Sequence, residues 1–492
     1  MKALRLGFVS SLGFAAAIAS AQYAGSQPVP EAYRRGFESI TIADAKELLG
    51  FLAGPECMGR GTGQPGYQVA ANYVAQKFLE FGLKPVADNG SYFQNLTFVR
   101  TSVHVGESRL VLGGAMVEVG KGLSLSGVTV GGELTGPIVF VNGPEGNEGL
   151  PEGVSVEGAI VVFRGAGRQN RARTAVMTGS PAAILTMVDE VVMPEPNVRL
   201  KSGQAGRQRA TRPTGQISRQ AAESLMAAAG VDRSVFNGAS EVKVARGSGD
   251  ATLTYKLDSQ DILVPNVIGL LEGSDPVLKE EVVGIGSHLD HLGVQNGVVY
   301  WGADDDGSGS TAILQIAKAM SVNPVKPKRS ILFMAFAAEE MGLIGSGFYA
   351  DNPIFPHSKM ICELQMDMVG RNEEKPGEPA SENIQTIHLV GSKRISTELD
   401  DLVNEANKYV NFTFEYDEEG VYTRSDHYNF AKHGIPIAFL FSGFHPDYHQ
   451  PTDTVDKINF EKLTNSSKLF YLVAMMAANR EGRFKPNEGG GQ

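Results

Sequence analysis

The amino-acid sequence predicts an α/β protein with a mixed, mainly parallel sheet flanked by helices and a second, β-rich domain inserted into it. After Pro265, short apolar strands alternate with helical segments, which is the pattern of a parallel sheet with helical crossovers. From about residue 105 to 249 the chain is instead rich in glycine and strand-like, as in "GPIVFVNG" and "GAIVVFRG". A chain of 492 residues is too long for one ordinary core. We therefore divide it into a domain formed by residues 22–104 and 250–484 and an inserted domain at 105–249.

The first 21 residues predict an export signal. Lys2 and Arg5 precede an apolar stretch from Leu6 to Ala19, and "ASA" at residues 19–21 has the small residues of a signal cleavage site. The stretch is short for a membrane span, and no later segment is long and apolar enough to be one. We expect residues 1–21 to be a cleaved signal peptide and the mature protein to be periplasmic or extracellular, with no membrane span.

Composition excludes several classes of function. The chain has 44 basic and 55 acidic residues, a net charge of -11, which argues against a nucleic-acid partner or an anionic membrane surface. Only Cys57 and Cys362 occur, so the fold is not a disulfide scaffold, and a zinc site built on cysteine would need more of them. The sequence does not decide whether these two cysteines pair, and it does not define the oligomeric state.

Two segments outside the predicted sheet have recognisable patterns. Ala70, Val74, Phe78 and Phe81 recur at helical spacing, and Gly82 follows as a C-terminal cap. The loop from Arg199 to Arg212 is dense in arginine; it is either a solvated loop or a contributor to a lid.

Ionisable residues follow the buried strands of the last part of the chain. "EVVGIGS" ends at His288, "SILFMAFAA" ends at Glu339 and Glu340, and "CELQM" ends at Asp367. Ligands of open α/β sheets bind at the carboxyl ends of the strands. The sequence therefore predicts a polar site at this edge of the sheet.

The loop "GADDDGSG", residues 302–309, lies between the first two of these strands and leads into a helix. Three adjacent aspartates repel one another unless a divalent cation supplies the missing charge, and the glycines let the backbone fold tightly around one. A cluster of helix N-caps explains the same residues, so the loop alone leaves both interpretations open.

Three further pairs of residues bear on this edge, and the first two are ambiguous when taken alone. In "SHLDHLG", His288 and Asp290 point to the same side of an extended segment, so Asp290 is placed to accept a hydrogen bond from a metal-bound imidazole. In "HPDYHQPTDT", His445 and His449 lie in a loop after the strand "IPIAFLF". Adjacent Glu339 and Glu340 would face opposite ways, so that one can bind a metal while the other addresses its water.

The ordered motifs identify a family. "SHLDHLG", "GADDDGSG", "AAEEMGLIGS", "MDMVG", "RSDHYNF", "GIPIAFL" and "YHQPTDT" resemble those of the secreted di-zinc aminopeptidases, the bacterial leucyl-type enzymes and their relatives. "GRGTGQPGYQVAANYVAQKFLEFGLKPVADNGSYFQNL" and "VPNVIGLLEGSDP" extend the likeness toward the N-terminus. The middle region resembles the protease-associated domain that many members carry as an insertion. The resemblance implies a zinc exopeptidase-like fold and two Zn²⁺ ions per chain.

Carried over by position, the resemblance assigns a role to each site residue. His288 and Asp367 bind one zinc, Glu340 and His449 bind the other, and Asp305 bridges them. The catalytic residues are Glu339 as general base, Asp290 as the residue that orients His288, and Tyr448 as the phenol that stabilises the oxyanion. Arg424 contacts the substrate backbone in some members.

The implied function is release of N-terminal amino acids from peptides with a free N-terminus. Three alternatives use the same scaffold: a carboxypeptidase acting on acidic dipeptides, a single-zinc cyclotransferase, and a non-catalytic receptor-like binding protein. His288 together with Asp367 argues against a single zinc, and no ligand of the family pattern is missing. The sequence does not define the preferred first residue or the physiological substrate.

Overall fold

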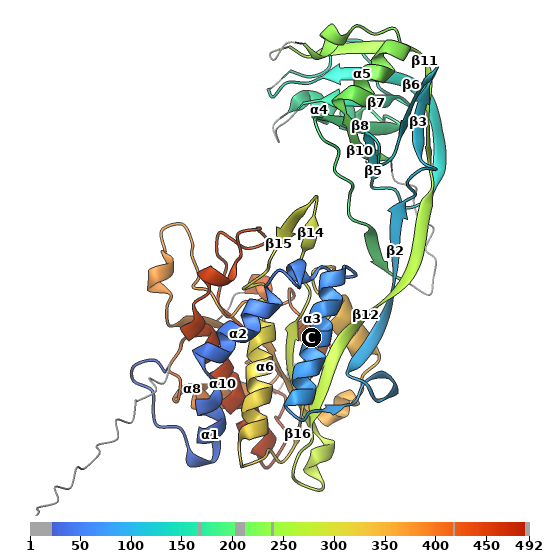
Figure 1. Cartoon of the computed structure of the whole chain (residues 1–492). Helices are drawn as coiled ribbons and strands as arrows, with labels where there is room; N and C mark the ends of the chain where they lie inside the picture. The colour runs from blue at the N-terminus through green and yellow to red at the C-terminus, as the bar shows by residue number, and fades with distance from the viewer. Residues whose placement is uncertain are drawn as a thin grey trace, which may run out of the picture.

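The computed structural model describes residues 22–146, 148–165, 170–201, 212–237, 241–416 and 419–487. It shows two lobes joined by a long two-stranded ribbon (Figure 1). The predicted signal peptide at 1–21 and most of the arginine-rich loop, residues 202–211, lie outside the described residues. Among the described helices, none is long and apolar enough to cross a membrane.

The first lobe is built on a ten-stranded sheet with the order β19-β18-β20-β17-β13-β16-β12-β2-β9, and β1 pairs with β12. These strands are β1 Lys84–Pro85, β2 Phe93–Val103, β9 Asn197–Leu200, β12 Leu257–Leu271, β13 Val282–His288, β16 Ser330–Phe336, β17 Met360–Met366, β18 Thr386–Val390, β19 Thr413–Glu415 and β20 Ile437–Phe441. Strands β20, β17, β13 and β16 are parallel, whereas β12, β2 and β9 continue the sheet antiparallel. The predicted mixed, mainly parallel sheet is confirmed in this central part.

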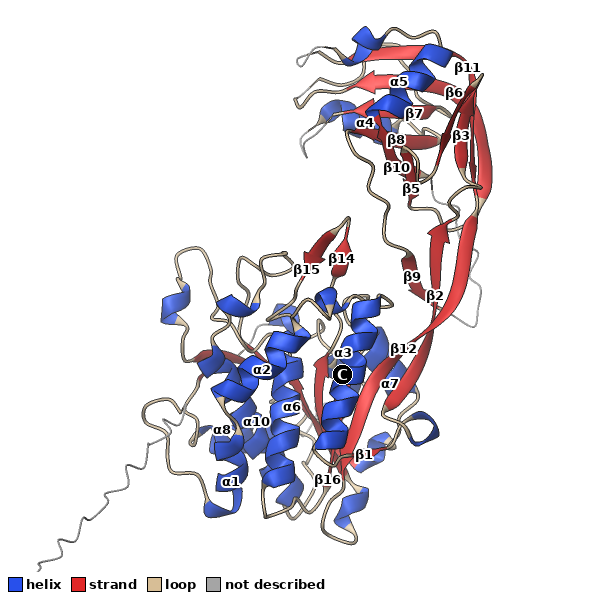
Figure 2. Cartoon of the chain, viewed as in Figure 1, coloured by secondary structure: helices blue, strands red, loops and turns tan. Residues whose placement is uncertain are grey.

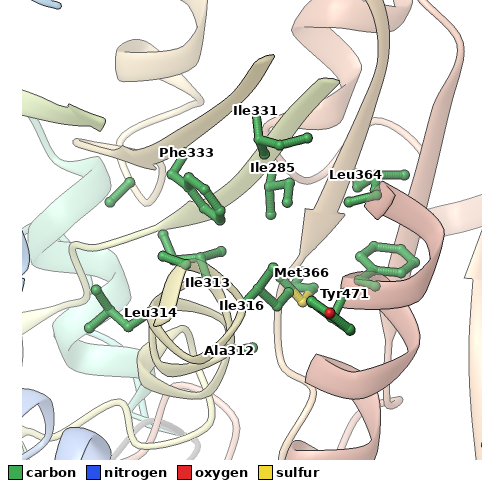
Figure 3. Packing of buried hydrophobic residues seen from close by; sticks show 14 of the residues in the cluster. Ile285, Ala312, Ile313, Leu314, Ile316, Ile331, Phe333, Leu364, Met366 and Tyr471 are labelled. Carbon is green, nitrogen blue, oxygen red and sulfur yellow. The ribbon is translucent and has the colours of Figure 1, made fainter. Parts of the chain in front are cut away.

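Helices cover both faces of this sheet (Figure 2). One face packs against α1 Glu31–Ser39, α2 Ile42–Leu52, α3 Pro65–Glu80, α6 Gly307–Val322, α8 Thr397–Asn407 and α10 Phe460–Asn479; the other packs against α7 Ile344–Asp351 and α9 His427–Ala431. Side chains alternate along β16, so Phe333 lies in the first core and Met334 in the second. Figure 3 shows Phe333 packed with Ile285 and with Ile313 of α6. Both faces are therefore buried, which explains the continuous apolar strands.

The predicted helix near residue 70 is confirmed as α3. Ala70, Val74 and Phe78 are buried, and the helix ends at Glu80 with Phe81 as its C-cap. Gly82 has a φ of +76°, the left-handed conformation that glycine adopts at low cost after a helix.

The second lobe is built on an eight-stranded sheet with the order β4-β3-β11-β6-β7-β8-β10-β5. These strands are β3 Arg109–Leu112, β4 Ala115–Glu118, β5 Leu123–Ser126, β6 Gly132–Asn142, β7 Ile160–Arg164, β8 Ala183–Val188, β10 Thr214–Ser218 and β11 Lys243–Tyr255. Strands β6, β7, β8 and β10 are parallel. Helix α5 Arg219–Ala228 packs in one of its cores and α4 Arg171–Thr178 in the other.

The edges of this lobe differ from the expected 105–249. Residue 249 falls inside β11, which pairs with β6 on both sides of an irregularity between Arg246 and Asp250. The "GSG" at residues 247–249 therefore marks a bulge within a strand instead of a linker. Strand β9, inside the expected range, belongs to the first sheet, where it pairs with β2.

A ribbon joins the two lobes, and a hairpin projects from the first lobe toward the second. Strands β2 and β12 pair from Phe93 with Val267 out to Val103 with Leu257. The hairpin of β14 Gly293–Gln295 and β15 Val298–Tyr300 projects from the first lobe toward the second (Figure 1). Asn296 and Gly297 form its turn with positive φ, as an Asn-Gly hairpin turn requires.

Candidate metal centre

The polar residues that follow the parallel strands meet at one edge of the first sheet. His288 ends β13, Glu339 and Glu340 follow β16, and Asp367 follows β17. The aspartate loop precedes α6, and His449 lies in the loop after β20. All five predicted metal ligands and Glu339 line one cavity of about 360 Å³.

Asp305 lies between two imidazoles and offers one oxygen to each. Its Oδ1 is 3.3 Å from His288 Nε2, and its Oδ2 is 3.1 Å from His449 Nε2. Asp367 Oδ1 completes the first group at 3.4 Å from His288 Nε2, and Glu340 Oε2 completes the second at 3.2 Å from His449 Nε2. The structure therefore brings together the two sets of residues that the sequence paired, with Asp305 shared.

These separations fit metal ions. Nitrogen and oxygen ligands at about 2.0–2.1 Å from a tetrahedral zinc lie roughly 3.3 Å from one another. Within the described residues, no lysine or arginine forms an ion pair with the side chain of Asp305, Glu340 or Asp367. Imidazole and carboxylate are ligands that zinc accepts, so the donor set suits that ion.

The ionisable groups of the site shift one another's pKa values. Burial lowers the pKa of His288, but the carboxylates of Glu339 and Asp367 outweigh it and hold this pKa well above its ordinary value. Burial raises the pKa of Asp305, but its neighbouring imidazoles hold it well below the ordinary value. Carboxylates likewise raise the pKa of His449 to about 10, against the effect of burial. The imidazoles and carboxylates around Asp305 thus interact strongly with one another, as groups that share a cation would.

The three adjacent aspartates have three different roles. Asp306 accepts hydrogen bonds from the backbone N–H groups of His288, Met368 and Gly309, so it caps α6 and ties two strand ends together. Asp304 accepts from the N–H of Gly370, and its other oxygen lies 3.3 Å from Nε2 of the buried His445. Asp306 is therefore the N-cap of α6, whereas only Asp305 faces both imidazoles.

Two buried residues that the sequence analysis missed hold this loop. The carboxylate of Asp453 accepts hydrogen bonds from the N–H groups of Asp304 and Asp305. Arg60, which is 0% exposed, donates to the carbonyl oxygens of Leu289, Leu52, Trp301, Gly302 and Asp305. Both come from distant parts of the chain, "GRG" and "PTDT", so only the folded structure reveals this role.

Asp290 contacts a different group from the one expected. The Nδ1 of His288 lies 3.0 Å from the backbone carbonyl oxygen of Asp290 and 4.0 Å from its carboxylate. The carboxylate instead accepts from the Thr62 hydroxyl and from the backbone N–H of Glu339. The Asp290 backbone thus orients His288, and its side chain fixes the chain at Glu339.

Glu339, Tyr448 and Arg424 lie around the cavity. Burial raises the pKa of Glu339 well above its ordinary value, and its Oε2 is 3.9 Å from His288 Nε2. The Arg424 guanidinium donates to the Tyr448 hydroxyl oxygen at 3.1 Å, and the Tyr448 ring stacks on His449. The apolar wall of the cavity consists of Met368, Val421, Phe439, Phe441 and Phe444.

A third imidazole, His291, also lies among the ligands. It is 2% exposed, and its Nδ1 is 2.8 Å from Glu340 Oε1 and 3.7 Å from Asp305 Oδ2. The sequence assigned no role to this residue, although it stands in the motif "SHLDHLG".

Backbone conformation is unusual at this edge. Ala338, Met368 and His449 have φ of 55°, 52° and 55°, in the left-handed region that residues other than glycine rarely adopt. His449 is a predicted metal ligand, Ala338 precedes Glu339, and Met368 follows Asp367. Such conformations cluster at functional sites, where the surrounding structure compensates for their cost.

Known proteins support this picture. The sequence matches peptidase family M28 over residues 266–474. Leupeptin-inactivating enzyme 1 of Streptomyces exfoliatus is 31% identical over 235 residues, 43% of this chain and 48% of that protein. The chain spans about half the length of the curated relatives it matches.

Two solved structures share the fold. The aminopeptidase from Aneurinibacillus sp. strain AM-1 superposes with a TM-score of 0.52 at 23% identity, covering 92% of this chain and 98% of that one. BSAP, a zinc aminopeptidase from Bacillus subtilis, gives 0.51 at 19% identity, with 92% and 97% covered. The family match includes β13, β16, β17, β20 and every predicted metal ligand. Residues 266–474 of the chain are therefore similar to peptidase family M28.

Proposed function

We propose that this protein is an exported aminopeptidase that uses two zinc ions, held by His288, Asp305, Asp367, Glu340 and His449. The observation that carries the proposal is the position of Asp305. Its two oxygens face two imidazoles, and each imidazole has a further carboxylate of its own. The zinc aminopeptidase from Bacillus subtilis with the same fold supports the choice of metal.

Zinc bound here would lower the pKa of a water and polarise the scissile carbonyl. Glu339 accepts the proton of the attacking water and later gives it to the leaving amine, because its carboxylate lines the cavity and lies 3.9 Å from His288 Nε2. The Tyr448 hydroxyl donates to the developing oxyanion. Arg424 occupies a lone pair of the Tyr448 oxygen, which leaves the O–H free for the substrate.

The cavity favours a substrate with an apolar first residue. Five of its lining residues are apolar, namely Met368, Val421, Phe439, Phe441 and Phe444. The carboxylates of Glu339 and Asp367 also line it, and they would attract a free α-amino group. A carboxypeptidase for acidic dipeptides would need cations for the carboxylates of its substrate, and Arg424 is the one lysine or arginine among the described residues that line this cavity.

The test combines metal content with substrate choice. Purified protein should contain two zinc ions, lose activity to chelators, and hydrolyse aminoacyl amides, with leucyl or phenylalanyl amides preferred over acidic ones. Acetylation of the substrate N-terminus should abolish hydrolysis. Cleavage of acetylated acidic dipeptides would favour the carboxypeptidase instead, and two bound zinc ions without any hydrolysis would favour a receptor-like binding protein.

Export and the identity of the second lobe belong to the same proposal. The sequence of residues 1–21 supports cleavage after Ala21, which N-terminal sequencing of the secreted protein would detect. The likeness of the middle region to a protease-associated domain supports a lobe that is separate from the metal centre, because no proposed ligand lies between residues 105 and 249.

A further inference from the structure

His291 contacts the second group of ligands in a way that hydrogen bonding does not explain. Its Nδ1 lies 2.8 Å from Glu340 Oε1, yet neither ring nitrogen of His291 nor this oxygen has a hydrogen-bond partner among the described residues. The atoms are close enough for a hydrogen bond, but they are not aligned for one. Ligands that point at a common ion approach one another in this way.

The distances agree with a shared ion. His291 Nδ1 is 2.8 Å from Glu340 Oε1 and 3.7 Å from Asp305 Oδ2, which bracket the roughly 3.3 Å expected between ligands of a tetrahedral zinc. His449, on the same two carboxylates, has separations of 3.1 and 3.2 Å. The rings of His291 and His449 meet edge to face with centroids 5.8 Å apart, and a nitrogen of each faces Asp305 Oδ2, at 3.7 and 3.1 Å.

The backbone around His291 holds the ring at this place. The N–H of His291 donates to the carbonyl oxygen of Arg60, whose guanidinium is itself fixed by five carbonyl groups. The ring packs against Gly302, where a Cβ would lie 2.4 Å from His291 Cγ. Gly302 also has a φ of +59°, so both its space and its conformation require glycine. The ring is therefore preorganised before any ion binds.

A second buried imidazole, His388, also lies beside two carboxylates, but there lysines supply the positive charge. His388 lies 3.2 Å from Glu373 and 3.7 Å from Glu415, but Lys375 pairs with Glu373 at 2.8 Å. Buried Lys462 also acts on both glutamates electrostatically. Lysines thus supply positive charge there, whereas Asp305 and Glu340 have only imidazoles as partners among the described residues.

We infer that His291 Nδ1 is a fourth protein ligand of the ion that Asp305, Glu340 and His449 hold. This assignment rests on the proposed two-zinc function. The ion is then enclosed by four protein ligands, whereas His288, Asp305 and Asp367 supply three to the other and leave a position for water beside Glu339. Closed four-ligand sites are typical of firmly held zinc, and three-ligand sites are typical of catalytic zinc. The two sites would therefore differ in the number of protein ligands that they offer.

X-ray absorption of the zinc-loaded protein tests the assignment directly. Three imidazoles shared by two ions give about 1.5 imidazole nitrogens per zinc in the wild type, and His291→Gln should reduce this to about 1.0. In chelator competition, His291→Gln should weaken one ion by at least about a hundredfold, which exceeds the loss of most outer-shell partners. His388→Gln, which removes the comparable buried imidazole, should leave both measurements unchanged.

The wild-type spectrum alone decides the question if the variant fails to fold. About one imidazole per zinc in the wild type overturns the assignment, even if His291→Gln weakens binding, since the ring would then act only through Glu340. A wild type that binds no zinc refutes the proposed function itself, whereas two bound ions with one imidazole each leave that function intact.

Discussion

The two lobes each contain four neighbouring parallel strands, and a cavity lies at the carboxyl ends of the strands in both. In the first lobe, residues after β13, β16 and β17 line a cavity of about 360 Å³. In the second, residues at the ends of β6, β7 and β8 line one of about 840 Å³. The first edge carries His288 and carboxylates whose ion-pair partners, among the described residues, are imidazoles. At the second, Arg164 donates to the carbonyl of Phe236, and Arg219 pairs with Asp189.

The comparison shows that the fold supplies the cavity, whereas the side chains that line it determine its chemistry. Parallel strands leave space beyond their carboxyl ends, because the chain must turn away there into a helix. The larger cavity belongs to the edge at which both arginines have partners, so size does not predict chemistry here. Carboxylates and imidazoles without another cation make the smaller edge the candidate active site.

The largest expected effect is at Glu339. Glu339→Gln keeps the shape of the side chain and removes the proton acceptor, so kcat should fall about a hundred- to ten-thousand-fold with little change in KM. Zinc content, measured by elemental analysis, should stay at two. Glu340→Gln should release one zinc. Arg164→Met at the other edge should change neither zinc nor kcat.

Loss of zinc from Glu339→Gln combined with its retention in Glu340→Gln would show that the two glutamates have the opposite roles. A fall in kcat for Arg164→Met as large as that for Glu339→Gln would remove the distinction between the two edges.

Two fully buried phenylalanines test whether the lobes have separate cores. Phe333 lies in the first lobe and Phe140 in the second, and both are 0% exposed. Replacement of either by alanine should cost about 3–5 kcal/mol through lost burial and the cavity left behind. Calorimetry of the zinc-loaded protein should show Phe333→Ala shifting the transition that zinc stabilises and Phe140→Ala shifting another one. A single transition, lowered equally by both variants, would mean that the lobes unfold as one unit.

A smaller effect concerns Asp426, which lies buried behind the first edge. Burial raises its pKa to about 7, and the carboxylates of Asp290 and Asp367 add to this. The protonated Asp426 carboxyl therefore contributes fully to the stability of the fold below its pKa in the unfolded chain, about 3.9. This contribution is lost as the pH rises through its folded-state pKa of about 7. Asp426→Asn cannot ionise, so metal-free variant protein should gain stability relative to wild type between pH 4 and 8, by roughly 2–4 kcal/mol.

Denaturant unfolding in the presence of chelator at several pH values measures this slope. Asp189→Asn is the control at the second edge, where a side chain that is 89% exposed is solvated in the folded and unfolded states alike. Parallel stability curves for wild type and Asp426→Asn would contradict the prediction.

The smallest expected effect is that of removing the second lobe. Val103 and Leu257 are paired across the ribbon, so an Asn-Gly turn joining them closes the chain as a hairpin. This shortened chain also lacks β9, the edge strand of the first sheet, but it keeps every predicted ligand, so it should bind the same two zinc ions with unchanged affinity. Loss of zinc from a folded chain of this kind would show that the second lobe supports the metal centre.

Much of the site is local in origin and could be predicted. The strands β13, β16 and β17 are continuous apolar runs, and each is followed at once by an ionisable residue, so spacing along the chain already places His288, Glu339 and Asp367 at one edge. The boundary of the second lobe was harder to predict. A Gly-Ser-Gly segment indicates a turn, but pairing with β6 absorbs it as a bulge inside β11. The short strand β9 gains its place only by pairing with β2.

The sequence by itself determined the elements, the edge at which they end and the types of ligand collected there, because periodicity and strand ends depend on neighbours in the chain. Only the tertiary structure decided which of three adjacent aspartates faces the imidazoles. Hydrogen bonds from Gly370 and Met368 engage Asp304 and Asp306, and Asp453 holds the backbone between them. It also decided that His291 lies among the ligands. That position depends on contact with Arg60 and Gly302, and spacing within a motif carries no information about such long-range contacts.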